Sequence, residues 1–507
     1  GGLTRQIQNS NGNDTSLNSN APSNKLQPSA TADSSDKNWQ TALRDGIVAN
    51  TAFQPKQITA KTDFLNQSLK TEDQSPKPIE INFRPDPSVY DGRYSNNGWL
   101  QELPKSLTKL TWDNAVLMNA ELAKKLDLNQ EVAEMGGSHG QTIADVVELK
   151  FDGKTLKVPA FIIEGHCDDS VTIYLGYGRT NAGKVGNGAG FNAYTLRNSG
   201  AMCFGENLEI SKTGETFSLA CTQAHHSMEG RDIVRHAKLA EYEKNPTFAK
   251  READDPDKQI SLYPGWEYNG HAWGMSIDTS ICNGCNACVV ACQSENNIPV
   301  VGKEEVLRAR EMHWIRVDTY YETDGENTNT LHQPVICQHC ENAPCEYVCP
   351  PGATTHSTEG LNEMTYNRCV GTRYCSNNCP YKVRRFNFFG YSDYETPVVQ
   401  LQRNPEVTTR SRGVMEKCTY CVQRIQYAKI NAETEGRELK DGEILTACQQ
   451  ACPTQAIIFG DKNDANSQVA KLKAEPTDYD LLADLNTRPR TTYLATITNP
   501  NEEIDRG

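Results

Sequence analysis

Cysteine is the residue type in this sequence with the clearest potential for chemistry, because most of its cysteines stand in tight groups. Of the 18 cysteines in the 507 residues, only Cys167, Cys203 and Cys221 lie outside the stretch from Cys282 to Cys452. A disulfide scaffold would be short and would spread its cysteines through its loops. Close spacing instead suits several thiolates that converge on one inorganic core. The four groups are Cys282, Cys285, Cys288 and Cys292; Cys337, Cys340, Cys345 and Cys349; Cys369, Cys375 and Cys379; and Cys418, Cys421, Cys448 and Cys452.

The spacing favours iron–sulfur clusters over zinc. The first group has the C-x2-C-x2-C-x3-C spacing of bacterial ferredoxins, in which the fourth cysteine ligates the other cluster of a pair. Pro350, Pro380 and Pro453 directly follow the last cysteine of the other groups and turn the chain, whereas Gln293 follows the first group. Paired C-x2-C knuckles also bind tetrahedral zinc. The remaining fifteen cysteines do not divide into sets of four, however, and the first group places too many thiolates on one turn for one zinc ion.

The third group lacks one thiolate. The C-x2-C-x2-C spacing of the first group, applied from Cys369, predicts a ligand at position 372, where this chain has Thr372. A neutral hydroxyl is a poor ligand for cluster iron compared with a thiolate. The simplest interpretation is three [4Fe–4S] clusters on twelve cysteines and one [3Fe–4S] cluster on the other three. The alternatives are that Thr372 itself ligates, or that water or an outside residue fills the fourth corner.

Composition excludes several classes of protein. A net charge of −14 makes binding to nucleic acid through phosphates a poor expectation. No apolar run approaches the length of a transmembrane helix. Residues 1–80 are rich in Ser, Asn, Gln and Asp, which predicts an extended linker or partner-binding segment. The sequence opens Gly-Gly-Leu without Met or a signal peptide, so we expect the processed or partial end of a longer polypeptide.

The region 90–265 has the pattern of a β domain followed by a helical connector. Asp152-Gly153-Lys154 separates two β-rich runs and predicts a hairpin. A glycine-rich stretch matches neither a P-loop nor a dinucleotide fingerprint and is interpreted as a loop. His225 and His226 are not expected to form a metal site, and the three outlying cysteines are expected to be ordinary buried or semi-buried residues. The expected elements are strands at 146–151, 155–162 and 170–177, helices at 113–126 and 229–244, and the loop at 176–190.

The region 270–460 carries the cysteine groups and predicts a doubled ferredoxin βαβ core with insertions. Lys382, Arg384 and Arg385 follow Cys379, where they would offset the negative charge of the thiolates or form a solvated docking patch. No general base and nucleophile stand together, so no substrate-converting site is expected. Residues 461–507 are polar and predict a tail that packs on a partner. The expected elements are strands at 273–277 and 314–319 and helices at 287–294 and 424–433.

The cysteine segment resembles the four-cluster electron-transfer subunits of the molybdopterin oxidoreductase superfamily. The resemblance rests on the cysteine motifs at 282–292, 338–345, 415–421 and 451–457. Upstream, the stretch WLQELP and the glycine-rich loop resemble the C-terminal β-barrel domain of the molybdopterin catalytic subunit. With both halves on one chain and the motif RCVGTRYC, the sequence resembles the C-terminal half of the iron–sulfur subunit of alternative complex III. It departs from that family because most of the molybdopterin-like region is missing.

The resemblance implies an α+β fold and a set of ligands. The fold would be a molybdopterin-oxidoreductase-type β-barrel domain, without bound molybdopterin, followed by the doubled ferredoxin domain. The first cysteine group would pair with the fourth and the second with the third, and each pair would exchange its last cysteine. The implied sets are Cys282, Cys285, Cys288 and Cys452; Cys292, Cys418, Cys421 and Cys448; Cys337, Cys340, Cys345 and Cys379; and Cys349, Cys369 and Cys375 for the three-iron cluster.

The resemblance also implies an electron relay. Electrons would pass from quinol, oxidised in an integral membrane subunit, towards a multihaem cytochrome c subunit. The chain would lie on the periplasmic face of the inner membrane, and a twin-arginine signal for its export would lie upstream or on a partner. The alternative is the relay subunit of a molybdopterin-dependent reductase for polysulfide or dimethyl sulfoxide. A more distant alternative is a scaffold whose clusters only hold the fold.

Overall fold

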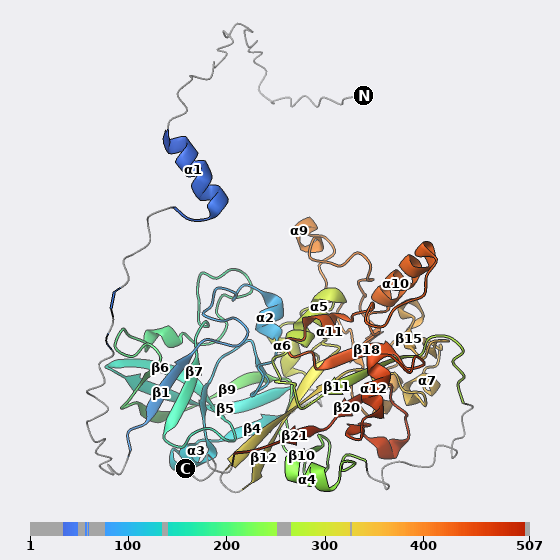
Figure 1. Cartoon of the computed structure of the whole chain (residues 1–507). Helices are drawn as coiled ribbons and strands as arrows, with labels where there is room; N and C mark the ends of the chain where they lie inside the picture. Colours follow the sequence, from blue (N-terminus) through green and yellow to red (C-terminus); the bar gives the residue numbers. More distant parts are fainter. Residues whose placement is uncertain are drawn as a thin grey trace, which may run out of the picture. The chain divides into compact units, whose positions relative to one another are not determined.

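The computed structural model describes residues 34–48, 56–57, 59, 77–133, 140–250, 265–324 and 327–501. The chain divides into two units, residues 1–73 and 74–507. The smaller unit contains helix α1 (Ser34–Asp45; Figure 1). Its apolar side chains Trp39 and Leu43 are exposed. Most of the segment predicted to be extended, residues 1–80, lies outside the described residues. Its described part includes helix α1, which is not extended.

Residues 77–250 of the larger unit are built on one nine-stranded sheet and are called the β domain. The strand order is β2-β9-β5-β6-β3-β7-β1-β8, and β4 pairs with β5 outside this path. Because successive side chains of a strand face opposite sides, Val116 and Met118 enter one apolar cluster and Leu117 enters another. The strands are β1 (Glu80–Arg84), β2 (Leu110–Thr111), β3 (Val116–Met118), β4 (Gln130–Ala133), β5 (Gln141–Phe151), β6 (Lys154–Ile162), β7 (Ser170–Tyr174), β8 (Phe204–Gly205) and β9 (Glu209–Cys221).

The sheet of the β domain is open, which corrects the expectation of a closed barrel. Within the described residues its outer strands, β2 and β8, do not pair with each other. Each has only two residues, so neither offers the continuous row of backbone groups that closure requires. A molybdopterin-oxidoreductase-type barrel is therefore not formed by these strands.

A tight turn joins β5 to β6 at the predicted hairpin. Phe151 pairs with Lys154 across the turn. Asp152 and Gly153 both have positive φ angles, 47° and 73°, as a two-residue type I′ turn requires. The hairpin predicted from the sequence is confirmed.

We expect Gly153→Ala to destabilise the β domain by about 1–2 kcal/mol, because a Cβ atom is unfavourable in the left-handed conformation. No heavy atom lies within 4 Å of the position that this Cβ would take, so the effect is conformational rather than steric. The measurement is the unfolding midpoint of the variant against that of Gly153→Asn, since Asn tolerates this conformation. Equal midpoints would contradict this account of the turn.

Two predicted helices of the β domain and its connector are wrong in part. Residues 113–126 divide into strand β3 and helix α3 (Ala120–Lys125), whose first turn is capped by Asn119, which accepts a hydrogen bond from Leu122 N at 2.8 Å. Residues 229–244 include strand β10 (His236–Lys238) before helix α4 (Leu239–Lys244). Strand β10 pairs with β21 (Thr496–Thr498), a partner far along the chain that local periodicity does not report.

The cysteine region forms its own sheet, in the order β18-β11-β20-β19. Strand β11 (Trp273–Asp278) runs antiparallel to β18 (Ile457–Asp461) and parallel to β20 (Thr491–Leu494). The predicted polar tail, residues 461–507, is thus wrong for its described part, because β19 (Asp478–Tyr479) and β20 belong to this sheet. All four side chains of β20 are buried, which a polar average over the whole segment conceals.

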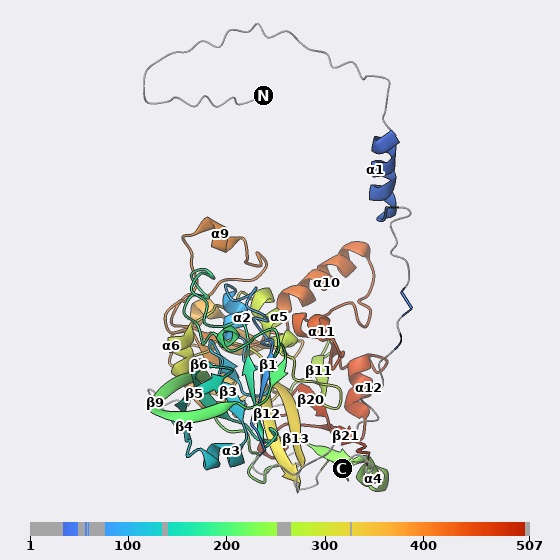
Figure 2. The ribbon, with the colours of Figure 1, turned by 90° about the vertical axis from the view of Figure 1, so that its left-hand side faces the viewer.

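Short helices and hairpins surround this sheet (Figures 1 and 2). The predicted helices 287–294 and 424–433 correspond to α5 and α10, and the predicted strands correspond to β11 and β12. These further elements are α5 (Ala287–Glu295), α6 (Lys303–Leu307), β12 (Arg316–Asp324), β13 (Asn327–Val335), α7 (Pro344–Tyr347), β14 (Thr354–His356), β15 (Asn362–Met364), α8 (Tyr374–Asn378), β16 (Arg385–Phe386), α9 (Pro397–Gln400), β17 (Met415–Glu416), α10 (Val422–Glu435), α11 (Ala447–Ala451) and α12 (Gln468–Ala474).

The β domain packs directly against the cysteine domain. Helix α2 (Gly98–Glu102) ends in the fully buried Glu102, whose carboxylate accepts hydrogen bonds from the backbone N–H groups of Val301 and Gly302. Lys303 forms a 2.7 Å ion pair with Asp113 of the β domain. Buried polar groups with partners on both sides fix the relative placement of two surfaces, so the β domain holds a defined position beside the first cysteine group.

Candidate metal centres

Each cysteine group lies on a loop that turns immediately before a short helix. Residues with positive φ stand at these turns: Asn286 before α5, Arg373 before α8 and Cys421 before α10. A left-handed residue reverses the local path of the chain without a long loop. The cysteines before the turn and those on the following helix therefore come close together.

The first set of thiols, set A, consists of Cys282, Cys285, Cys288 and Cys452. Burial raises the pKa of Cys282, and the thiolates of Cys452 and Cys285 raise it further. The pKa of Cys288 is raised first by burial and then by the thiolates of Cys448, Cys282, Cys285 and Cys452. The last cysteine of the fourth group thus lies beside the first group, an arrangement that pairing of the first group with the fourth requires.

Set B consists of Cys292, Cys418, Cys421 and Cys448. Burial raises the pKa of Cys292 well above its usual value, and the thiolates of Cys418, Cys421 and Cys448 add to the effect. Burial, followed by the thiolate of Cys448, raises the pKa of Cys421 to about 12. The last cysteine of the first group thus lies beside three cysteines of the fourth.

Set C consists of Cys337, Cys340, Cys345 and Cys379, and set D of Cys349, Cys369 and Cys375. The pKa of Cys340 is raised by burial and then by the three other thiolates of set C. Burial also raises the pKa of Cys375. Arg384 acts in the opposite direction, and the thiolates of Cys349 and Cys369 raise this pKa further. All fifteen predicted site cysteines therefore fall into four neighbourhoods, with three thiols in the last.

The four sets follow one another in a row. Sets A and B adjoin where the thiolate of Cys448 acts on Cys288. Sets B and C adjoin where the thiolate of Cys337 acts on Cys418. Arg384 joins C to D, because thiolates of both sets raise the pKa of its guanidinium. These contacts link the sets in the order A, B, C and D, in which A and D come first and last.

The surroundings of the thiols suit thiolate ligands of iron. Every described cysteine is free of a disulfide. Backbone N–H groups donate to sulfur, Ala353 N to Cys349 Sγ at 3.2 Å and Ala456 N to Cys452 Sγ at 3.3 Å. Such donors favour thiolates, the form that binds iron. Because burial and mutual repulsion raise the pKa of the bare thiols, a positively charged core is what would make so many buried thiolates stable together.

Thr372 occupies in its loop the place that Cys285 occupies in the first group. A glycine with positive φ precedes each of them, 65° at Gly284 and 73° at Gly371. The residue after each also has positive φ, 62° and 63°, and directly precedes helix α5 or α8. Thr372 and Cys285 are both exposed. The backbone of the third group thus presents a hydroxyl where the first group presents a thiol.

Of the three cations predicted to offset thiolate charge, only Arg384 is placed to do so. Arg384 is buried and donates to Thr354 Oγ1 at 2.6 Å. Lys382 is exposed and donates to the backbone oxygen of Asn377. Arg385 forms a 2.7 Å ion pair with Glu311. The prediction treated the three as one patch because adjacent positions in a sequence do not reveal which side chain points inward.

Sequence analysis did not single out the amides that contact the thiols. Asn296 Nδ2 donates to Cys292 Sγ at 3.5 Å, and Asn362 Nδ2 lies 3.8 Å from Cys345 Sγ. Asn296 follows helix α5 and lies four residues after Cys292, so this spacing could have predicted the contact. Asn362 reaches its sulfur from the separate strand β15, so no local pattern predicts its role.

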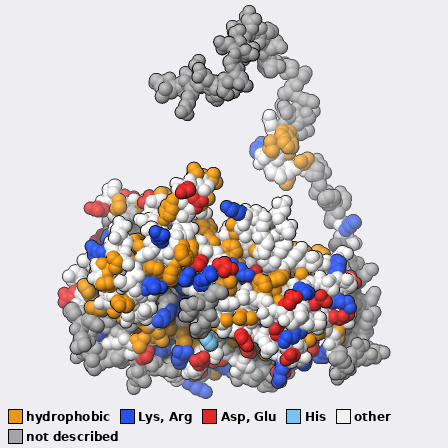
Figure 3. Space-filling model, turned by 180° about the vertical axis from the view of Figure 1, so that it is seen from behind, with side chains coloured by type: hydrophobic (Ala, Val, Ile, Leu, Met, Phe, Trp, Pro, Cys, Tyr) orange, Lys and Arg blue, Asp and Glu red, His pale blue; other side chains and the backbone are white. Residues whose placement is uncertain are grey.

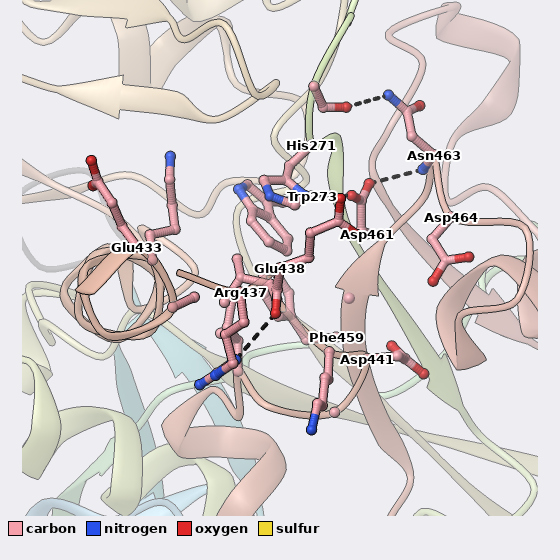
Figure 4. Close-up of a pocket in the computed structure, with 18 residues that line it drawn as sticks. His271, Trp273, Glu433, Arg437, Glu438, Asp441, Phe459, Asp461, Asn463 and Asp464 are labelled. Carbon is pink, nitrogen blue, oxygen red and sulfur yellow. Dashed lines mark hydrogen bonds and ion pairs between the residues drawn. The ribbon is translucent and has the colours of Figure 1, made fainter. Parts of the chain in front are cut away.

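A column of aromatic rings in contact, three of whose four contacts are stacked and one edge-to-face, connects the cysteine loops to a surface cavity. His339 and Tyr420, which lie inside two C-x2-C pairs, stack at 3.9 Å between ring centroids. Phe459 and Trp273 continue the column, and His271 stacks on Trp273 at 4.9 Å. The last three rings line a cavity of about 730 Å³ beside helix α10 (Figure 4). The column packs the loops of sets B and C from one side.

The remaining cysteines and histidines stay apart from the four sets. Cys221 is buried, but Cys167 and Cys203 are exposed, which corrects the expectation that all three are at least semi-buried. His226 Nδ1 lies 3.0 Å from the backbone oxygen of Thr319. In the described part of the chain, no three or more His, Cys, Asp or Glu side chains form a site for a single metal ion. Among the described residues, no helix has the length and apolar character needed to span a membrane.

Known proteins share the cysteine domain. Two family models described as 4Fe–4S dicluster domains match, one over residues 328–390 and the other over 281–353 and 368–456. The iron–sulfur cluster-binding subunit of menaquinone reductase from Nitratidesulfovibrio vulgaris is 40% identical, over 44% of this chain and 88% of its own length. Iron–sulfur subunit 1 of an Hdr-like menaquinol oxidoreductase from Archaeoglobus fulgidus is 34% identical, over 44% of this chain and 82% of its own length. A putative iron–sulfur subunit of dimethyl sulfoxide reductase from Halobacterium salinarum is 38% identical, over 44% of this chain and 78% of its own length.

The four thiol sets and the dicluster models define an iron–sulfur protein of the ferredoxin type. The relatives are at least 34% identical to this chain over 78% or more of their own length, which identifies the family. This chain belongs to the family of iron–sulfur subunits of oxidoreductase complexes. The dicluster models lie within residues 281–456, so the β domain stands outside them.

Proposed function

We propose that this chain is the electron-transfer subunit of a membrane quinol oxidoreductase of the alternative complex III type. It would relay electrons from quinol towards a multihaem cytochrome c partner. The observation that carries the proposal is the row of four thiol sets, which runs from D through C and B to A. When bound, iron–sulfur clusters supply one-electron transfer, and each set would hold one cluster.

The cluster types follow from the number of thiols in each set. Sets A, B and C have four thiols each and would hold [4Fe–4S] clusters. Set D has three thiols, with Thr372 at the fourth place, and would hold a [3Fe–4S] cluster. No molybdopterin is assigned to this chain, because the open sheet of the β domain provides no argument for a site.

Set D is the proposed end for quinol-derived electrons. Large apolar side chains within two residues of its cysteines in the sequence are exposed: Val370 by 67%, Tyr374 by 58% and Tyr347 by 51%. On the face shown in Figure 3, apolar groups are interspersed with charges of both signs. Exposed apolar and aromatic side chains are typical of contacts with another protein. An integral quinol-binding subunit is the proposed partner here, and the periplasmic face of the membrane is the proposed location of the chain.

The names of the relatives support a quinone-linked role, since two of them are subunits of a menaquinone reductase and a menaquinol oxidoreductase. One specific observation favours a second candidate function: the 38% identity to a putative dimethyl sulfoxide reductase subunit. In that case the partner would be a molybdopterin-dependent reductase. Metal analysis of the intact complex distinguishes them, because haem iron without molybdenum supports the first candidate and molybdenum supports the second.

The decisive experiment is a redox titration of the intact complex, followed by EPR. We expect one three-iron signal in the oxidised state and signals of four-iron clusters on reduction. Quinol should reduce the three-iron cluster, and cytochrome should reoxidise it. Clusters that are present but do not respond to quinol or cytochrome would leave only a scaffold role and would overturn the relay. Protease-accessible chain on the cytoplasmic side of vesicles would overturn the periplasmic placement.

Deletion of residues 1–73 should weaken retention of the chain in its complex and leave its iron content unchanged. This segment forms a unit separate from residues 74–507, and helix α1 exposes Trp39 and Leu43. The deletion stops before β1, so the β domain keeps its first strand. The measurement is the amount of chain that co-purifies with the membrane subunits, with iron assayed in parallel. Undiminished retention would contradict a partner-binding role for this segment.

A further inference from the structure

Lys109 of the β domain is a buried cation beside set A. Its side chain is 1% exposed, and its backbone has a φ of 59°. The backbone is held by two hydrogen bonds, from Lys109 N to Lys105 O and from Thr222 N to Lys109 O. A lysine in a left-handed conformation costs about 1–2 kcal/mol. The fold therefore fixes an unfavourable backbone at the residue whose ammonium group enters the interior.

The ammonium group of Lys109 has no hydrogen-bond partner among the described residues. The two nearby acidic side chains already have arginine partners. Asp318 is 2.8 Å from Arg316 Nε, and Glu311 is 2.7 Å from Arg385 Nη1. Lys109 thus has no hydrogen-bonded carboxylate of its own among the described residues, although Asp318 attracts its charge more strongly than any neighbouring thiol does.

A small cavity lies beside Lys109. Its volume is about 20 Å³, and its lining includes Lys109, Glu311 and His313. Glu311 Oε2 and His313 Nε2 are buried and, among the described atoms, also without hydrogen-bond partners. One water needs roughly 10–15 Å³ by this measure and two to four polar partners. The cavity therefore suits a single buried water that hydrates the ammonium group.

Lys109 lies beside the loop of set A, because the same small cavity is lined by Lys109 and by Asn286, which stands between Cys285 and Cys288. Burial lowers its pKa to about 8, and Asp318 and the thiolates of Cys221, Cys282 and Cys288 act in the opposite direction. The loop of set A is also pinned to the β domain, because Asn286 Nδ2 donates to Pro104 O at 2.7 Å. The charge and the loop thus keep a fixed separation.

We propose that Lys109, hydrated by one buried water, is a positioning residue that raises the reduction potential of the cluster held by set A. This inference rests on the proposed function, because it requires a cluster at set A. A positive charge in a low-dielectric interior favours the state with one more electron. The β domain, which the dicluster models do not cover, thereby acquires a part in electron transfer at the end of the row opposite to set D.

The test is an EPR redox titration of the full chain, loaded with its clusters, in wild type and in Lys109→Met. We expect the equilibrium constant for reduction of one four-iron cluster to fall at least tenfold, which is about 59 mV for a one-electron couple. The affected signal should be the one that Cys452→Ser alters. Lys109→Arg, which keeps the charge, should retain a potential close to that of wild type.

The matched control is Lys105→Met. Lys105 is equally buried, but its ammonium group is bound by Asp113 O, Tyr177 Oη and Asp86 within the β domain. This variant should leave all cluster potentials unchanged. If Lys109→Met does not fold, Lys109→Gln replaces it in the comparison with Lys109→Arg.

Three results would overturn the proposal. One is an unchanged set A potential in a fully loaded Lys109→Met or Lys109→Gln. The second is an equal shift of all four clusters, and the third is the same shift in Lys105→Met; both would indicate a general structural effect. The absence of iron–sulfur signals from the wild-type chain would instead refute the proposed function, so the two failures are distinguishable.

Discussion

Replacing Thr372 with cysteine should add one iron atom per chain and abolish the EPR signal of the oxidised three-iron cluster. Thr372 stands where Cys285 stands in the first group, between a glycine and a second residue that both have positive φ. The backbone is therefore already in the conformation that presents a ligand, so the new thiolate needs no rearrangement. Since both positions are exposed, the substitution introduces no overpacking.

The same substitution should slow quinol oxidation. A three-iron cluster normally has a higher potential than a four-iron neighbour, because it has one fewer anionic ligand and a different core charge. Completion of the fourth corner lowers that potential and makes the first electron transfer from quinol less favourable. The measurement is the steady-state rate with quinol, alongside the EPR titration and the iron content.

Asn377→Cys is the matched control, because it places an exposed thiol on helix α8, which directly follows the loop of Thr372, but away from position 372 itself. It should change neither iron content nor signal. A wild-type chain without a three-iron signal, or a Thr372→Cys chain that keeps one, would show that Cys349, Cys369 and Cys375 do not hold a three-iron cluster.

Local spacing in the sequence predicted the features that depend on local geometry. The turns before helices α5 and α10 bring together cysteines that are separated by two residues, and this spacing is directly visible as C-x2-C. Asp152-Gly153 likewise predicts its hairpin because a type I′ turn needs two residues that tolerate positive φ. Which groups share a centre was available only through family resemblance, since spacing does not report contacts between distant loops.

The features that sequence analysis missed depend on pairing between distant segments. Strand β20 pairs with β11 across most of the cysteine domain, so a polar average over the end of the chain suggested a tail. Closure of the β domain sheet depends on whether two outer strands meet, and periodicity carries no such information. The inward orientation of Arg384 and the burial of Lys109 are set by tertiary packing in the same way.

Arg384→Met should lower the reduction potentials of both clusters at the quinol end and destabilise the loaded chain by about 3–5 kcal/mol, the usual cost of removing one partner from a buried charge arrangement. Thiolates of sets C and D, those of Cys345 and Cys375 foremost, raise the pKa of the Arg384 guanidinium despite its burial. Reciprocally, its positive charge stabilises the reduced, more negative state of each cluster. Methionine retains much of the volume and removes only the charge and the hydrogen bonds.

Lys382→Met is the control for this prediction, because Lys382 lies two residues away but is exposed. Exposed charges are screened by solvent and salt, so this variant should leave potentials and stability nearly unchanged. EPR titration measures the potentials, and the unfolding midpoint of the loaded chain measures stability. Because Arg384 interacts with both sets, two signals should shift together in Arg384→Met, whereas Lys109→Met should shift only the signal at the opposite end of the row. A shift of one signal alone in Arg384→Met would place this guanidinium beside a single cluster and contradict its position between sets C and D.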